Sequence, residues 1–149
     1  MNAFVLDNSV TMRWLMASSK KSDQDYAEQV LKSLANCKVL VPNLWHLEVT
    51  NVLLNAIRRK EIMPSQCTVF LTHLEQLPIQ IDNFTAIRAF SRTLNYGELY
   101  KLSSYDAAYL ELAIRQGVPI ATLDKDLIKA ATALGVKRYL IDDLSTIDI

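Results

Sequence analysis

The stretch LSSYDAAYLELAIRQGVPIATLDKDL, residues 102–127, combines a helix, a turn, a strand and the start of a second helix. Ser103 is a typical N-cap, and Gly117 is a typical residue just beyond a helix C-terminus. The apolar run from Val118 to Leu123 predicts a strand, and a helix is predicted over residues 125–135. A strand placed between two helices in this way is typical of a parallel β-sheet.

The same alternation extends outward over the whole chain. Strands are predicted at residues 3–6, 38–41, 79–81, 118–123 and 138–141. Helices are predicted at residues 9–16 (one or two turns), 25–36, 43–60, 64–77, 84–94, 103–117 and 125–135, with Asn43 as the N-cap of the third. We therefore expect a single α/β domain over residues 1–149, in which helices cover both faces of a mostly parallel sheet.

The composition is that of an ordinary globular protein. Half of the 149 residues are hydrophobic, and 16 Lys and Arg balance 16 Asp and Glu, so binding to nucleic acid would need a local basic patch. The two cysteines, Cys37 and Cys67, have no metal-binding spacing, which favours the reducing cytoplasm. The N-terminus lacks a signal-peptide pattern, and no uncharged run is long enough to span a bilayer, so we expect no membrane association.

Four acidic residues stand at positions where such a chain places functional groups. Asp7 and Asp124 follow predicted strands, and Asp106 lies in the first turn of a helix. Glu48 interrupts the apolar line of another helix, where a carboxylate is costly to bury unless it is paired. In parallel sheets, ligands bind beyond the carboxyl ends of the strands. Carboxylates that meet there repel one another, so the pattern indicates a site for a hard divalent cation.

Each acidic residue also has a purely structural explanation. Asp7 and Asp124 could be N-caps, and Asp106 could complete a capping box with Ser103. Glu48 could take part in hydrogen bonds between helices. Four separate explanations are then required, whereas one cation accounts for all four residues, so we favour the metal site.

The chain resembles a PIN domain, and specifically the toxin ribonuclease of a VapC-type toxin–antitoxin pair. The resemblance is carried by D-x-S (Asp7, Ser9), E-x-x-N (Glu48, Asn51), YDAAYLELA with Asp106, and T-x-D-x-D-L (Thr122, Asp124, Asp126). It implies a three-layer α/β/α sandwich with a protruding helical hairpin, and an endoribonuclease that uses Mg²⁺ or Mn²⁺ to hydrolyse RNA. It also implies a homodimer that is inhibited by a cognate antitoxin.

The resemblance assigns roles to individual residues. Asp7, Glu48, Asp106 and Asp124 match the acidic quartet that binds metal and performs catalysis, and Ser9, Asn51 and Thr122 match supporting positions. Whether Asp124 or Asp126 provides the fourth ligand stays open, and we favour Asp124 because it follows the strand directly.

Basic residues beside the motifs, Arg13 and Lys101, are candidates for RNA binding. The apolar hairpin over residues 43–77 is expected to provide a surface for dimerisation or for the antitoxin. The alternative function is a catalytically inactive PIN-like module that binds a protein partner. A P-loop is excluded because the chain has only three glycines and none in that pattern.

Overall fold

The computed structural model describes residues 2–141. Its strands are β1 (Asn2–Leu6), β2 (Cys37–Pro42), β3 (Ile79–Asp82) and β4 (Ile120–Ala121). Its helices are α1 (Asn8–Thr11), α2 (Lys21–Ser33), α3 (Trp45–Arg58), α4 (Pro64–Glu75), α5 (Thr85–Arg88), α6 (Leu94–Tyr100), α7 (Ser104–Gln116) and α8 (Lys125–Ala133). Short 3₁₀ turns η1 (Met12–Trp14) and η2 (Leu34–Asn36) follow α1 and α2, and a π-helical turn η3 (Ala89–Thr93) joins α5 to α6.

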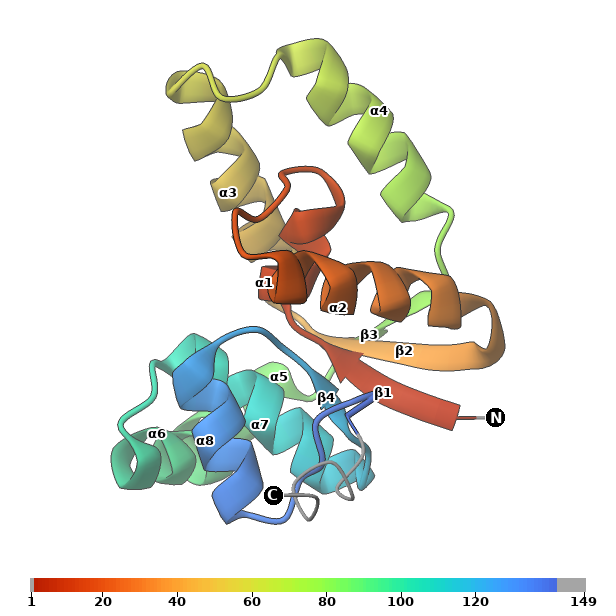
Figure 1. Ribbon diagram of the computed structural model, residues 1–149. Helices are drawn as coiled ribbons and strands as arrows, with labels where there is room; N and C mark the ends of the chain where they lie inside the picture. The colour runs from red at the N-terminus through yellow and green to blue at the C-terminus, as the bar shows by residue number, and fades with distance from the viewer. Residues whose placement is uncertain (1, 142–149) are drawn as a thin grey trace.

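The strands form one parallel sheet in the order β3-β2-β1-β4. Figure 1 shows α2, α3 and α4 on one side of this sheet and α5 to α8 on the other, which confirms the predicted three-layer α/β/α arrangement. Because all strands run in the same direction, their carboxyl ends lie at one edge of the sheet. The segments that follow β1 and β4 therefore begin side by side: the Asp7 N–H donates to the Ala121 carbonyl at 3.0 Å.

The core forms where the sheet and its helices meet. Phe4, Val5 and Leu6 of β1 are fully buried, as a central strand covered on both faces requires. On the α7 side, Tyr109 and Leu110 are also fully buried. This packing fixes β1 and α7 rigidly, and both elements lead into or carry the predicted acidic residues.

Several predicted boundaries differ from the structure. The strand predicted at residues 138–141 is only an isolated parallel bridge between Ile120 and Arg138. The backbone turns away at Leu140, whose φ of 66° does not fit an extended strand. The helix predicted at residues 84–94 continues through η3 and α6 to Tyr100, and α2 begins four residues earlier than predicted, at Lys21. Leu44, not Asn43, is the N-cap residue of α3.

The predicted helical hairpin consists of α3 and α4, which extend away from the sheet in Figure 1. Its turn is made possible by Lys60 in the left-handed conformation, with a φ of 59°. Pro64 opens α4, where its missing N–H costs nothing. None of the helices in the described part of the chain is long and apolar enough to cross a bilayer.

Candidate functional site

Asp7 is the most buried of the four predicted carboxylates, with 2% of its surface exposed. It follows β1 and occupies the N-cap position of α1, but its side chain makes no capping hydrogen bond. Instead, its Oδ2 atom accepts hydrogen bonds from the Ser9 hydroxyl at 2.6 Å and the Thr122 hydroxyl at 2.8 Å. The side chain is therefore held toward the end of β4, and helix capping does not explain it.

Ser9 and Thr122 connect the ends of β1 and β4 through their hydroxyl groups. Each hydroxyl donates to Asp7 and accepts a backbone N–H: Ser9 accepts from Leu123 at 3.0 Å, and Thr122 accepts from Asp124 at 3.0 Å. Thr122 is fully buried. Two of the residues predicted as supporting positions, Ser9 and Thr122, thus fix the Asp7 carboxylate relative to the Asp124 backbone.

Glu48 lies in the first turn of α3 and is half-buried. Its Oε1 atom accepts a hydrogen bond of 2.6 Å from the hydroxyl of Tyr109, which is fully buried in α7. Tyr109 was not among the predicted site residues, although it follows Asp106 by three residues and so lies on the same line of the helix. This bond fixes the direction of Glu48 from the opposite side of the sheet.

Asp106 and Asp124 both lie at helix N-termini, as predicted. The Asp106 N–H donates to the Ser103 hydroxyl at 3.1 Å, which confirms Ser103 as the N-cap of α7. Asp124 is itself the N-cap of α8, because its Oδ1 atom accepts from the Leu127 N–H at 2.9 Å. Helix capping therefore explains the position of Asp124. The second oxygen of its carboxylate takes no part in that hydrogen bond.

The carboxylates influence one another electrostatically. Burial raises the pKa of Asp7 from 3.8 to about 6; the bonds from Ser9 and Thr122 lower it, and the charges of Glu48 and Asp124 raise it. Burial also raises the pKa of Asp106 to about 6, with further increases from the charges of Asp124, Asp7 and Asp126.

The pKa of Glu48 is likewise raised, first by burial and then by the charge of Asp106, against the lowering effect of the Tyr109 bond. The four carboxylates consequently belong to one electrostatic group. Perturbed titrations that arise from burial and like charge are typical of functional sites.

The chemistry of this group fits a hard divalent cation. Its donors are carboxylate and hydroxyl oxygens, which Mg²⁺ and Mn²⁺ prefer, and a cation would relieve both the burial and the mutual repulsion of the charges. As the side chains stand between residues 2 and 141, no group of three or more Asp, Glu, His or Cys residues forms a completed cage. Binding of a cation would therefore require the side chains of the other carboxylates to adjust around Asp7, whose own carboxylate is already held by hydrogen bonds.

The remaining predicted residues are Asn51, Asp126, Arg13 and Lys101. Asn51 is exposed on α3, and Asp126 is exposed in the first turn of α8, from where its charge raises the pKa of Asp106. Arg13 is half-buried in η1. Lys101 is exposed after α6 and adopts the left-handed conformation, with a φ of 55°.

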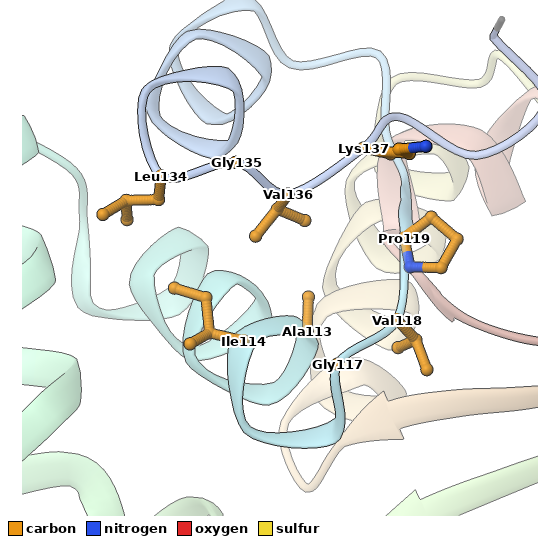
Figure 2. Close-up of a pocket in the computed structure, with 9 residues that line it drawn as sticks. All are labelled: Ala113, Ile114, Gly117, Val118, Pro119, Leu134, Gly135, Val136 and Lys137. Carbon is orange, nitrogen blue, oxygen red and sulfur yellow. The ribbon is translucent and has the colours of Figure 1, made fainter. Parts of the chain in front are cut away.

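A separate apolar cleft of about 340 Å³ lies at the other end of β4, between the C-terminal ends of α7 and α8 (Figure 2). Figure 2 shows Val136 facing Ala113 and Ile114 across this cleft, with Val118 and Pro119 just before the strand. The carboxylates follow β4, whereas the cleft precedes it. The cleft is therefore not part of the acidic group.

The family model described as PIN domain matches residues 4–133 of the chain. The fold is similar to the crystal structure of PAE2754 from Pyrobaculum aerophilum, with a TM-score of 0.62 and 18% identity over 87% of this chain and 79% of that one. It is also similar to FitAcB from Neisseria gonorrhoeae, with a TM-score of 0.60 and 17% identity over 91% of this chain and 96% of that one. The sequence matches none of the curated proteins.

Proposed function

Because this chain belongs to the PIN domain family, we propose that it is a divalent-metal-dependent endoribonuclease, the toxin of a toxin–antitoxin pair. Members of the family are in general nucleases that use divalent ions. One observation carries the proposal: Asp7 is a buried carboxylate that caps no helix and is in electrostatic contact with Glu48 and Asp124. Such a side chain is costly to keep unless a cation compensates it.

Asp7 and Asp106 would hold Mg²⁺ or Mn²⁺ directly, and Glu48 and Asp124 would complete the set of ligands. When bound, such an ion polarises the scissile phosphate and makes a nearby water a stronger nucleophile. Ser9 and Thr122 keep Asp7 in place through the hydrogen bonds to its Oδ2 atom. Of the two carboxylates that complete the set, Glu48, whose pKa is raised, would accept a proton from the attacking water.

Basic side chains that neighbour the acidic motifs along the chain would hold the RNA, because the acidic group itself repels a polyanion. Arg13 follows α1 directly after the Asp7 motif, and Lys101 precedes α7 and Asp106. Removal of either residue should raise KM for RNA and leave kcat unchanged, since phosphate contacts position the substrate.

A second copy of the chain is the partner proposed for an apolar face on α5, η3, α6 and the start of α7. This face is formed by the exposed side chains Ile87, Phe90, Leu94 and Tyr105, and Phe90 is 94% exposed. An apolar cavity of about 600 Å³ adjoins Phe90 and includes Leu94, Gly97 and Tyr105 in its lining. When two copies are related by a two-fold axis, the projecting Phe90 ring of each copy can pack against the apolar cavity of the other.

The hairpin of α3 and α4 is then available for the antitoxin. Met63 and Val69 are exposed on it, and a cavity of about 400 Å³ lies between α4 and η1. The hairpin is thus the proposed docking surface for the antitoxin, and the Phe90 face is the proposed dimer interface.

Cleavage of total RNA by the purified chain tests the proposed activity. We expect cleavage with Mg²⁺ or Mn²⁺, none with EDTA, and at least about a hundredfold loss in Asp7→Asn, beyond the effect typical of outer-shell partners. Glu75→Gln, which removes an exposed carboxylate from α4, is the matched control.

Equal activity of Asp7→Asn and the unmodified chain would refute the assignment. Absence of cleavage under all conditions, together with tight binding of the protein encoded beside it, would instead favour the inactive interaction module. The capping role of Asp124 is compatible with that alternative.

A further inference from the structure

The segment after α8 runs alongside β4 and is fixed in the core. The Ile120 N–H donates to the Lys137 carbonyl at 3.0 Å, and the Tyr139 N–H donates to the Ile120 carbonyl at 2.8 Å. The Tyr139 ring stacks on Phe4 of β1, with 3.8 Å between the ring centroids, and its hydroxyl donates to Ser33 at 2.7 Å. This segment lies beyond residues 4–133, which the family model matches.

Arg138 connects this segment to the carboxyl end of β4. Its Nε atom donates to the Thr122 carbonyl at 3.1 Å, and its guanidinium lies 4.2 Å from the centroid of the Tyr26 ring. The Tyr26 hydroxyl in turn donates to the Tyr139 carbonyl at 2.8 Å. β4 has only two residues. The contacts of Arg138 therefore hold its carboxyl end in place, as backbone hydrogen bonds to neighbouring strands would do for a longer strand.

Thr122 is the residue through which this support reaches the acidic group. Its carbonyl accepts from Arg138, its hydroxyl donates to Asp7 at 2.8 Å, and the same hydroxyl accepts from the Asp124 N–H at 3.0 Å. The orientation of the Thr122 peptide thus sets the position of two of the carboxylates. The sequence gives no sign of this link, since Arg138 belongs to none of the acidic motifs.

We propose that Arg138 is a positioning residue for the metal-binding group, acting through the hydrogen bond from its Nε atom to the Thr122 carbonyl. This inference rests on the proposed metal-dependent function. Arg138 itself contacts neither Asp7 nor Asp124 in the described hydrogen bonds, so its effect is on their placement. A guanidinium suits the position because it can stack flat on Tyr26 while Nε donates within the same plane.

Two neutral variants of similar length separate the hydrogen bond from the charge. In Arg138→Gln, the amide nitrogen stands at the place of Nε and can donate to Thr122, whereas Arg138→Met fills the same space without a donor. We expect Arg138→Met to lose about tenfold in Mn²⁺ affinity, measured by calorimetry, as for other outer-shell changes. Arg138→Gln should stay close to the unmodified chain. Lys129→Ala, an exposed site on α8, controls for the loss of one positive charge.

Steady-state cleavage and hydrogen exchange provide two further measurements. A positioning role predicts that Arg138→Met lowers kcat and leaves KM for RNA unchanged. It also predicts faster exchange of the Leu123 and Asp124 amides, whose acceptors are the Ser9 and Thr122 hydroxyls. A rise in KM alone would identify a direct RNA contact and overturn the proposal, as would equal losses of affinity in the Gln and Met variants.

The exchange measurement also keeps this proposal separate from the proposed function. If the unmodified chain binds no Mn²⁺, the metal-dependent function fails. Faster exchange of the Leu123 and Asp124 amides in Arg138→Met, but not in Arg138→Gln, would still support the positioning of β4 by Arg138. Unchanged exchange in both variants would refute that positioning.

Discussion

At the scale of single residues, Asp7 shows how a short motif acquires a function. An Asp after a strand and before a helix is compatible with N-capping and with metal binding. The structure decides against capping, because the Asp7 carboxylate accepts no backbone N–H of α1 and instead receives the hydroxyls of Ser9 and Thr122. A buried charge held in this way raises the free energy of the folded chain until a cation binds.

Asp7→Asn should stabilise the metal-free protein at neutral pH. The folded pKa of about 6 exceeds 3.8, so the ionised side chain disfavours folding above pH 6, and this cost disappears as the pH falls through 6 toward 4. A shift of this size corresponds to about 3 kcal/mol at pH 7. Urea unfolding in EDTA at pH 7 and at pH 4 measures the difference.

The expected result is a more stable Asn variant at pH 7 and nearly equal stabilities at pH 4. The Glu75→Gln control should show no such pH dependence. A less stable Asn variant at pH 7 would contradict the cost assigned to the buried charge.

Tyr109→Phe should weaken metal binding with little change in packing. The substitution removes the hydroxyl that donates to Glu48 at 2.6 Å, so the carboxylate loses its fixed direction and its pKa rises further. We expect Mn²⁺ affinity to fall about tenfold and the free energy of unfolding to fall by about 1–2 kcal/mol. Calorimetry and urea unfolding measure these two quantities.

Tyr105→Phe, at an exposed position of the same helix, is the matched control. In the background of Glu48→Gln, removal of the Tyr109 hydroxyl should have a smaller effect on Mn²⁺ affinity. Equal effects in both backgrounds would show that the hydroxyl acts independently of Glu48.

At the scale of secondary-structure elements, two helix N-termini present carboxylates to the site. Ser103 caps α7 and thereby fixes the turn that carries Asp106, and Asp124 caps α8 with its own side chain. Sequence patterns predicted both helix starts, because capping is a local interaction between neighbours in the chain. They could not show which carboxylate oxygens were left for a cation.

Two substitutions of Asp124 separate its capping role from its proposed metal-binding role. Asn preserves an N-cap, whereas Ala should cost about 1 kcal/mol of stability through loss of the bond to the Leu127 N–H. If Asp124 is also a ligand, both variants should lose cleavage activity by at least about tenfold. Thermal unfolding and RNA cleavage measure the two effects. Full activity of Asp124→Asn would leave Asp126 as the candidate, which Asp126→Asn then tests.

A buried ion-pair cluster, which was not predicted from the sequence, connects β3 to α7. Arg115 binds Asp82 with two hydrogen bonds of 3.0 and 2.7 Å, and its Nε atom donates to Glu111 at 2.8 Å. Asp82 and Glu111 are both buried, so removal of Arg115 would take away the ionic partner of Asp82 and leave Glu111 with only the longer contact to Arg88, at 3.8 Å. Glu111 and Arg115 are neighbours on one helix, but Asp82 is 33 residues away from Arg115, so the link to β3 gave no local signal in the sequence.

At the scale of the whole molecule, two apolar surfaces compete for the proposed partners. Phe90→Ser should dissociate a dimer that forms through the face around η3, raising its Kd by about thirtyfold, as expected for a residue at the centre of an interface. Folding stability should change by less than about 0.5 kcal/mol, because Phe90 is 94% exposed in the single chain. Sedimentation velocity across a concentration series measures the Kd.

Val69→Ser, on the hairpin, is the matched control and should leave the dimer intact. The opposite result, dissociation by Val69→Ser alone, would place the dimer interface on the hairpin, which is one of the two roles predicted for the hairpin from the sequence. A monomer at every concentration of the unmodified chain would refute dimerisation through either surface.

The sequence by itself determined the order of elements and the fold class. Apolar periodicity, helix caps and glycine stops are interactions between residues near one another in the chain, so they can be interpreted locally. The predicted boundaries were wrong where tertiary contacts determine the end of an element. Residues 138–141 have a strand-like composition, but the chain pairs with β4 only at Arg138 before Leu140 turns away. The continuous helix from α5 to α6 depends on packing against α7, which its own sequence does not show.

Only the tertiary structure decided how the acidic residues relate to one another. The motifs named Asp7, Glu48, Asp106 and Asp124, but the bonds that orient them come from Thr122 and Tyr109, which are 115 and 61 residues away from their partners. Such contacts depend on which strands become neighbours and on where α3 and α7 lie on the two sides of the sheet (Figure 1). A hydrogen bond acts over a few ångströms whatever the distance along the chain, so its partners become known only when the fold brings them together.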